Sequence, residues 1–425
     1  MRRTEPATSV NLNWPHLRTA RRNPLRAKLA RLLFLRNVRD LPLSVTMPDG
    51  SRFGRGDGRF AAGGDPNLTI NDPDVFFSRL GRDRSLGFGE AYLLGAWDCG
   101  MSPHAEATAG DELAAWLAVY ADHLKSGETP LHYGVRSLLH LAHPLSQRNS
   151  EEGAVANVQA HYDLDEQLFE TFLDDAMVYS SAWFEPGDDL ASAQSRKIDA
   201  ILDLAKVGPG TRLLDIGSGF GGLAMRAASQ RRAEVVGLTL SQNQLDYSSS
   251  RARNAGLDVS FVLEDFRRHN GVYDAVVSVE MIEAVGSEYW VEYFQAVERH
   301  LKPGGFFALQ VITFPHRRMR AAKKDFSWVD RYIFPGGELP SMREIHRILM
   351  SHTRMEVVET RRLSDSYAET LRQWRHRFVE ARSAVTRLGF DDTFCRLWVL
   401  YFAYFEAGFR ARYCDVWQVG IRKAG

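Results

Sequence analysis

The chain has 425 residues, 44% of them hydrophobic and 25% charged, and a formal net charge of zero. This is the composition of a folded globular protein long enough for two domains, and the charge balance argues against a general nucleic-acid binder. No apolar run reaches the roughly 18 residues that a membrane-spanning helix needs, and the N-terminus lacks the apolar core of a signal peptide. The three cysteines, Cys99, Cys395 and Cys414, match neither a disulfide framework nor a zinc site, so we expect no metal and a cytoplasmic location.

The first 40 residues form a basic segment, with ten Lys and Arg residues against Glu5 and Asp40. Within it, the stretch Leu25–Arg36 mixes basic residues with leucines at helical spacing. One interpretation is a helix that lies on an anionic membrane surface, which would place the protein at the inner face of the membrane. The other is a basic helix packed on the N-terminal domain with its arginines in solvent, and both stay open.

Residues 1–110 are expected to form a small N-terminal α/β domain. Leu43–Met47 has the pattern of a strand, Pro48–Ser51 that of a turn, and Asn71–Asp74 supplies capping residues for a helix. We expect residues 111–154 to form a helical linker and residues 155–425 to form the catalytic domain.

The stretch Thr211–Gly222 is an apolar strand that runs into a glycine-rich turn, and a helix-like segment follows it. Gly217 and Gly219 let the backbone turn sharply and approach a ligand closely, with a helix N-terminus directed at it. Asp215 lies at the strand end, where ligands bind in open α/β sheets. The motif predicts a nucleoside cofactor site, although a dinucleotide site or a turn without a ligand would show the same glycines.

Strand-like segments continue at the spacing of βαβ units: 234–240, a strand ending at 263–266, 273–280, 306–313 after a turn at 301–305, and 415–421. The first of them ends in Thr239 and Ser241 rather than in the acid expected for a dinucleotide site. We therefore expect an α/β fold with a mostly parallel sheet. This order of landmarks resembles that of class I methyltransferases, and the resemblance implies a Rossmann-like sheet of seven strands, helical lid insertions and S-adenosylmethionine as the cofactor.

Residues 366–410 are predicted to form two helices crowded with aromatic residues, among them Trp374, Phe378, Trp398 and Phe402. An aromatic stripe at helical spacing is usually core. Its position between the last two strands also allows an apolar tunnel for a substrate, and this alternative stays open.

Several segments together resemble the cyclopropane-fatty-acid synthase family: His161–Leu164, Met177–Ala182, Ser192–Gln194, Leu214–Gly222, Leu238–Ser241 with Gln244, Ser278–Gly286, Tyr332–Pro340, and Tyr367 with Trp374. The match covers about residues 155–425, and Leu86–Asp98 is similar to the small domain of longer members. Glu280–Gly286 with Gln310 resembles a branch that contains plant cyclopropane synthases and actinobacterial enzymes of 10-methyl fatty-acid synthesis.

The resemblance implies transfer of a one-carbon unit from S-adenosylmethionine to the double bond of an unsaturated phospholipid acyl chain. Methyl transfer to an alkene leaves a carbocation, so the site must exclude water and remove one proton. Proton loss from the new methyl group closes a cyclopropane ring. A hydride shift before proton loss gives a methylene group, which a partner reductase could convert to a methyl branch.

In this family the proton acceptor is a bound bicarbonate. The resemblance places its binding groups, our expected catalytic residues, at Glu283, Gln310, Tyr367, Ser181 and Ile312. Serine at 181 stands where cysteine is usual, glutamine at 310 where histidine is common, and Ala284 replaces a histidine. The alternatives are that Glu283 is only an acid at a helix start, that Tyr367 is core, and that Gln310 satisfies a neighbouring backbone group.

The expected cofactor contacts follow the glycine motif and the resemblance. Tyr179 and Ser180 precede the motif, Thr239 and Gln244 would hold the ribose end, and Glu264 the adenine end. The full set is Tyr179, Ser180, Asp215, Gly217, Gly219, Thr239, Leu240, Gln244 and Glu264.

Two other functions remain open: C-methylation of a small soluble molecule, and a non-catalytic lipid-binding homologue suggested by the changes at 181, 284 and 310. We expect a membrane phospholipid as partner and no nucleic acid, and the family suggests a homodimer formed through the N-terminal domain.

Overall fold

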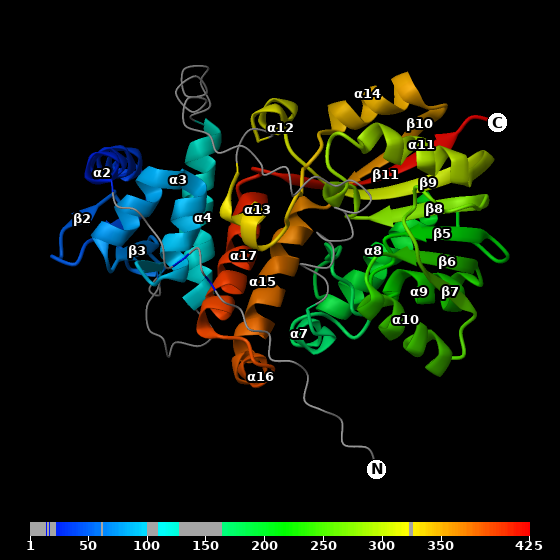
Figure 1. Cartoon of the computed structure of the whole chain (residues 1–425), viewed down its shortest axis with the longest axis horizontal. Helices are drawn as coiled ribbons and strands as arrows, with labels where there is room; N and C mark the ends of the chain where they lie inside the picture. The colour runs from blue at the N-terminus through cyan, green and yellow to red at the C-terminus, as the bar shows by residue number, and fades with distance from the viewer. Residues whose placement is uncertain are drawn as a thin grey trace, which may run out of the picture. The chain divides into compact units, whose positions relative to one another are not determined.

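The computed structural model describes residues 14, 17, 23–60, 63–99, 109–126, 164–322 and 326–425. The chain folds into two compact units (Figure 1). The smaller comprises Met1–His123, Gln167–Phe172 and Arg372–Ala407, and the larger comprises Leu124–Glu166, Leu173–Leu371 and Gly408–Gly425. The expected boundary at residue 154 and the segment 161–163 lie outside the described residues. Across the part of the chain described, no helix is long and apolar enough to cross a membrane.

The larger unit is built on a seven-stranded sheet in the order β10–β11–β9–β8–β5–β6–β7 (Figure 1). Strands β5 to β9 pair with one another in parallel, whereas β11 is antiparallel to both β9 and β10. The predicted α/β fold with a mostly parallel sheet is confirmed. The strands are β5 (Arg212–Ile216), β6 (Glu234–Thr239), β7 (Val259–Leu263), β8 (Tyr273–Val279), β9 (Leu301–Thr313), β10 (Met355–Arg362) and β11 (Asp415–Lys423).

Helices cover both faces of this sheet and form a separate core on each (Figure 1). Leu213 belongs to one core and Leu214 to the other, because successive side chains of a strand point to opposite faces. One face carries α8 (Leu190–Leu204), α9 (Gly222–Arg231) and α10 (Gln242–Asn254), and the other carries α11 (Trp290–His300) and α14 (Met342–His352).

Short helices lie between the main elements of the larger unit. They are the 3-10 turn η4 (Ile282–Ala284), α12 (His316–Ala322) and α13 (Trp328–Tyr332), the last two in the expected lid region. The turn predicted at 301–305 is instead part of β9, where a register shift opposite Tyr273 and Ala275 absorbs the extra residues. The edge strand β10 was not predicted, because its sequence is largely charged and exposed.

The smaller unit contains a four-stranded sheet in the order β2–β1–β3–β4. Asp72 caps the long helix beside it by accepting a hydrogen bond of 3.0 Å from the backbone N–H of Val75, as the sequence predicted. Its elements are α2 (Pro24–Val38), β1 (Ser44–Thr46), β2 (Arg52–Phe53), β3 (Asn67–Ile70), α3 (Pro73–Leu93), β4 (Trp97–Cys99) and α4 (Ala109–Ser126), with α7 (Glu166–Glu170) overlapping it in part.

The aromatic region forms three helices rather than two: α15 (Ser364–Glu380), the short α16 (Arg382–Arg387) and α17 (Asp392–Arg410). Within the smaller unit their aromatic rings pack on one another around Phe172, whose ring centroid lies 5.3 Å from that of Phe402 and 5.5 Å from that of Trp398. Phe402 and Trp374 are fully buried. These contacts are what we expect if the aromatic residues form part of the hydrophobic core.

Candidate active site

The glycine loop joins the end of β5 to the start of α9. Gly217 and Gly219 have φ values of 82° and 53°, in the left-handed region that favours glycine. A Cβ atom on Gly217 would lie only 2.8 Å from Cγ of Met281, so no larger residue fits there. The loop therefore has the close-approach backbone that a nucleoside cofactor requires.

Asp215 is buried at the end of β5, and its Oδ2 atom has no hydrogen-bond partner among the described residues. Burial raises the pKa of this carboxyl to about 7, although the positive charge of Lys197 opposes the shift. An unsatisfied buried carboxylate oxygen costs free energy unless a donor fills it. The ammonium group of a bound S-adenosylmethionine would supply such a donor.

The end of β6 presents a second polar group. The Thr239 hydroxyl donates a hydrogen bond of 2.7 Å to Oε1 of Gln244, and both side chains are buried. Ser241 caps α10 by accepting from the backbone N–H of Gln244, and Leu240 precedes it in the chain. Because the amide oxygen of Gln244 is bound to Thr239, its N–H groups are what it offers to ribose oxygens.

Glu264 follows β7, where the adenine contact was expected. Its Oε2 atom lies 2.6 Å from Nδ1 of His269, and Nε2 of that imidazole lies 2.7 Å from the Tyr273 hydroxyl. The carboxylate is thus already oriented by a neighbouring side chain, and its contact with a cofactor stays a prediction.

The segment before α8 carries Tyr179 and Ser180. Gln194 of α8 donates a hydrogen bond of 2.8 Å to the backbone oxygen of Ser180, and Lys197 of the same helix donates one of 2.5 Å to the Ser180 hydroxyl. Tyr179, which precedes Ser180 in the chain, is partly buried. The helix therefore fixes this segment through two buried polar side chains.

The central finding is the position of Glu280, directly after β8. Its Oε1 accepts hydrogen bonds from the backbone N–H of Ser181 at 2.9 Å and from Nε2 of Gln310 at 2.8 Å. Its Oε2 accepts one from the Tyr367 hydroxyl at 2.6 Å. Three of the groups expected to hold bicarbonate therefore come together, but around a carboxylate of the chain itself.

The backbone at Glu280 is strained in a way that supports a special role. Its φ is 51°, and for a residue with a Cβ atom this conformation costs on the order of 1–2 kcal/mol. Such outliers persist only where the surroundings over-determine them, and they cluster at functional sites. Here the carboxylate is held by its three hydrogen bonds and the backbone N–H by the oxygen of Gln310 at 2.8 Å.

The other two expected residues form an adjoining pair. Ile312 donates its backbone N–H to Oε1 of Glu283 at 2.5 Å, while Oε2 of Glu283 is buried without a partner among the residues described. The Glu283 backbone oxygen accepts from the N–H of Glu338, which ties η4 to the segment after α13. Glu283 thus contacts Ile312, and in the described part of the chain its carboxylate is not hydrogen-bonded to Ser181, Gln310 or Tyr367.

The orientation of the Gln310 amide is fixed by a hydrogen bond from Gln418. Gln418 lies opposite Gln310 in the register of β11 with β9, and its Nε2 donates to Oε1 of Gln310 at 3.1 Å. The same nitrogen donates to the backbone oxygen of Lys197. With its oxygen occupied, Gln310 directs Nε2 to Glu280 and to the oxygen of Ser181.

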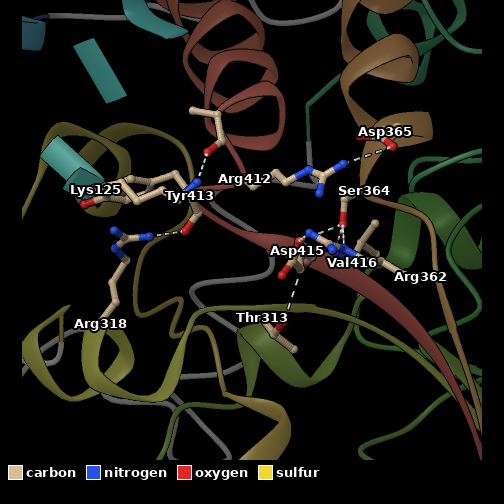
Figure 2. A network of polar contacts seen from close by, with 11 residues as sticks. Lys125, Thr313, Arg318, Arg362, Ser364, Asp365, Arg412, Tyr413, Asp415 and Val416 are labelled. Atoms are coloured by element: carbon tan, nitrogen blue, oxygen red, sulfur yellow. Dashed lines mark hydrogen bonds and ion pairs between the residues drawn. The ribbon is translucent and has the colours of Figure 1, made fainter. Parts of the chain in front are cut away.

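Tyr367 is placed by the first turn of α15, which a polar network anchors to β11 (Figure 2). The Ser364 hydroxyl accepts from the N–H of Val416 at 3.2 Å and donates to Oδ1 of Asp415 at 3.0 Å. Arg362 donates to the same hydroxyl and pairs with Asp415 (Figure 2). This anchoring holds the start of α15 against β11 and with it the Tyr367 hydroxyl.

Two acids and a lysine dominate the electrostatics of the site. Burial, reinforced by the negative charge of Glu280, raises the pKa of Glu283 to about 8. Burial also raises the pKa of Glu280, but the hydrogen bonds from Tyr367 and Gln310 and the charge of Lys197 oppose this. Neighbouring carboxyls in environments of this kind divide their roles, with one neutral and one ionised near neutral pH.

Lys197 and Glu280 were not among the site residues predicted from the sequence. Burial lowers the pKa of Lys197 to about 8, although the carboxylates of Glu280, Asp174 and Asp215 oppose the shift. A lysine between Gln194 and Ile198 on the apolar face of α8 was a visible signal. Glu280 begins the Glu280–Gly286 motif that resembles one branch of the family, but the motif assigns it no role, because that role depends on the left-handed backbone turn after β8.

The chain is similar to known proteins over most of its length. The chain matches the family model described as mycolic acid cyclopropane synthetase over residues 149–419. It is 40% identical over 434 residues to the tuberculostearic acid methyltransferase UfaA1 of Mycobacterium tuberculosis, covering 99% of this chain and 98% of that protein. It is 35% identical over 358 residues to the cyclopropane-fatty-acyl-phospholipid synthase of Escherichia coli, covering 83% of this chain and 87% of that protein.

Solved structures give the same result. The mycolic acid cyclopropane synthase CmaA1 complexed with SAH and CTAB matches with a TM-score of 0.58 at 31% identity, covering 63% of this chain and 98% of that one. Coclaurine N-methyltransferase matches with a TM-score of 0.60 at 18% identity, covering 79% and 98%, and confirms the class I methyltransferase fold alone. The family predicted from the motifs is confirmed. Because the family model spans more than half of the sequence, the chain belongs to the mycolic acid cyclopropane synthetase family and is an S-adenosylmethionine-dependent methyltransferase.

Proposed function

We propose that this protein transfers a one-carbon unit from S-adenosylmethionine to the double bond of an unsaturated phospholipid acyl chain. The observation that carries the proposal is a carboxylate, Glu280, ringed by hydrogen-bond donors beside the cofactor loop. Gly217 of that loop packs against Met281, the residue after Glu280. The relatives in Mycobacterium tuberculosis and Escherichia coli, both named as enzymes of fatty-acyl chains, support this assignment.

The site residues fit S-adenosylmethionine, which when bound supplies an electrophilic methyl group. Asp215 would accept from its amino group, the glycine loop would pack against the nucleoside, and Thr239 with Gln244 would hold the ribose. An alkene needs no base in order to attack the electrophilic methyl group. The polar groups of the chain are therefore required only after methyl transfer, to stabilise the carbocation and to accept its proton. The Tyr367 ring stacks on Phe409 with centroids 4.5 Å apart and offers the kind of aromatic face that stabilises a cation.

The same carbocation serves a cyclopropane and a methylene product. Proton loss from the transferred methyl group closes the ring, and proton loss after a hydride shift gives the methylene group. The relative that matches over almost the whole chain is named as a methyltransferase, which favours the methylene product. Conversion to a methyl branch would need a partner reductase, and this partner stays a prediction.

Helix α2 supports action at a membrane surface. Phe34 and Val38 are buried on one side of the helix, and Phe34 packs against Phe76 with ring centroids 5.2 Å apart. Exposed leucines occupy the opposite side at spacings of four and three residues, and the exposed bases Arg26, Lys28 and Arg36 flank them. The exposed leucines are Leu25, Leu29, Leu32 and Leu33, at 79%, 54%, 66% and 48% exposure.

One face of this helix packs on the N-terminal unit, as one of the two interpretations predicted, and the other face presents leucines among bases. Leucines with flanking cations suit the interface of an anionic bilayer. These features support action at the cytoplasmic face of the membrane, where a phospholipid substrate would lie. A homodimer stays an expectation from the family.

The test is incubation with methyl-labelled S-adenosylmethionine and oleoyl-phospholipid vesicles, with and without a reductase, followed by mass spectrometry and NMR of the acyl chains. The proposal expects label in the acyl chain as a ring, a methylene group or a methyl branch. Turnover of a soluble substrate with no label in lipid would favour a small-molecule methyltransferase. Cofactor binding with no turnover at all would favour a non-catalytic homologue.

A further inference from the structure

The geometry points to Glu280 as the proton acceptor of the reaction, a carboxylate of the chain in the position where a bound bicarbonate was expected. This inference rests on the proposed function, because it concerns the proton that the acyl carbocation must lose. It makes the base part of the polypeptide and the enzyme independent of an added anion.

The hydrogen-bond donors expected to hold a bicarbonate already donate to the Glu280 carboxylate. A carboxylate and a bicarbonate share a planar pair of oxygens, and Glu280 fills both positions with normal hydrogen bonds of 2.6 to 2.9 Å from Ser181, Gln310 and Tyr367. A bicarbonate in the same place would lose these donors and would lie against a second negative charge. The residues present therefore do not fit bicarbonate.

Burial raises the pKa of Glu280, but three hydrogen-bond donors and the charge of Lys197 favour its ionised form, and Glu283 has no such set of donors. Lys197 is the cation that faces Glu280, and the carboxylates of Asp174 and Asp215 in turn face that lysine. Glu283 has one oxygen on the Ile312 N–H and one with no donor among the described residues, the arrangement of a neutral acid. Glu280 receives three donors and is the member of the pair able to accept a proton.

The reaction balances with groups already named. The alkene π electrons form the new C–C bond, the S–CH3 bond breaks with its pair left on sulfur, and the neighbouring carbon becomes cationic. A Glu280 oxygen then removes a proton, and the released C–H pair closes the ring or, after a hydride shift, forms the methylene double bond. The proton then passes from Glu280 to solvent, which restores the carboxylate.

The backbone offers a clean variant for the test. The φ of 51° at Glu280 suits glycine, so Glu280→Gly removes the carboxylate without opposing the local fold and leaves the donors facing an empty space. Glu280→Gln keeps the shape but fills that space with a neutral amide. The two variants therefore separate loss of charge from loss of volume.

The experiment measures turnover of oleoyl-phospholipid in CO2-free buffer and again with bicarbonate or formate added. Wild type should be unaffected by either anion. Glu280→Gly should lose turnover on the order of 10²–10⁴-fold, the usual contribution of a general base, and regain part of it in a saturable manner with anion. Glu280→Gln should show the same loss without rescue.

A second measurement does not depend on activity. Titration calorimetry with bicarbonate should show binding to Glu280→Gly and none to wild type, with S-adenosylmethionine binding retained by both. If wild type labels no lipid, the proposed function fails, and the calorimetric result still decides whether Glu280 occupies an anion site. Wild-type turnover that requires bicarbonate, full activity of Glu280→Gly in CO2-free buffer, or absence of both rescue and anion binding in that variant would overturn the inference.

Discussion

The hydroxyl of Tyr367 donates a hydrogen bond of 2.6 Å to Oε2 of Glu280, although the two residues lie 87 positions apart in the chain. One stands in the first turn of α15 and the other just after β8. Hydrogen bonds to the ionised form of a carboxyl favour that form, so this contact lowers the pKa of Glu280. Glu280 can therefore act as an ionised base at lower pH than it could without Tyr367.

Removal of that contact should therefore shift the pH dependence of turnover. In Tyr367→Phe the pKa of Glu280 rises, because the hydrogen bond that opposed the effect of burial is lost. Since the base must be ionised, activity is lost as pH falls through that pKa, and the acid limb of the kcat profile moves to higher pH. Kinetics across the pH range, with circular dichroism to check folding, measure this. An unchanged acid limb would contradict the assignment.

Lys197→Met should also move the acid limb of the kcat profile to higher pH. The substitution removes the positive charge that favours the ionised forms of Glu280 and Asp215, so the pKa of both carboxyls rises. We expect a lower kcat near neutral pH and weaker binding of S-adenosylmethionine. Lys206→Met, at an exposed position of the same unit, is the matched control and should behave like wild type.

Glu283→Gln should be milder than Glu280→Gln. With its pKa raised to about 8, Glu283 is mostly neutral at pH 7, and an amide resembles a neutral acid more closely than it resembles a carboxylate. We expect Glu283→Gln to retain at least about tenfold more turnover than Glu280→Gln, within the range that a general base contributes. Equal losses in the two variants, measured under saturating S-adenosylmethionine, would contradict the division of roles.

The double variant Leu29→Glu, Leu32→Glu should lose binding to anionic vesicles. It places negative charge on the exposed face of α2 and leaves the buried face with Phe34 and Val38 intact. Vesicle co-sedimentation should fall several-fold, while turnover on detergent-dispersed lipid stays. Met350→Glu, at a residue that is 84% exposed on α14, is the control and should bind vesicles normally.

Phe402→Ala tests whether the aromatic cluster is core. Phe402 is fully buried and packs on Phe172 and Trp398. Truncation should lower the free energy of unfolding by about 3–5 kcal/mol, the cost of a large cavity. Denaturant titration measures this, and unchanged stability with altered substrate choice would instead favour the tunnel interpretation.

The sequence was most informative where a motif depends on local backbone chemistry. The glycine loop, the strands that alternate with helices and the cap at Asp72 were all predictable, because positive φ, strand periodicity and side-chain capping act over a few residues. The structure also brings together Ser181, Gln310 and Tyr367, three of the residues that the family motifs selected.

What these three residues bind was not predictable. Glu280 lies three positions before the acid that the family pattern selects, and only the left-handed turn after β8 brings its carboxylate to their donors. Lys197 was not predicted as a site residue because a lysine is usually solvent-exposed. Its burial depends on the packing of α8 against the sheet. Both are consequences of tertiary structure rather than of local pattern.

The most direct test of the central claim compares wild type and Glu280→Gln with methyl-labelled S-adenosylmethionine and oleoyl-phospholipid in CO2-free buffer, with cofactor binding measured on the same samples. The account predicts labelled acyl chains from wild type, and from Glu280→Gln normal cofactor binding with turnover reduced on the order of 10²-fold or more. Label appearing in lipid at the wild-type rate with Glu280→Gln would contradict it.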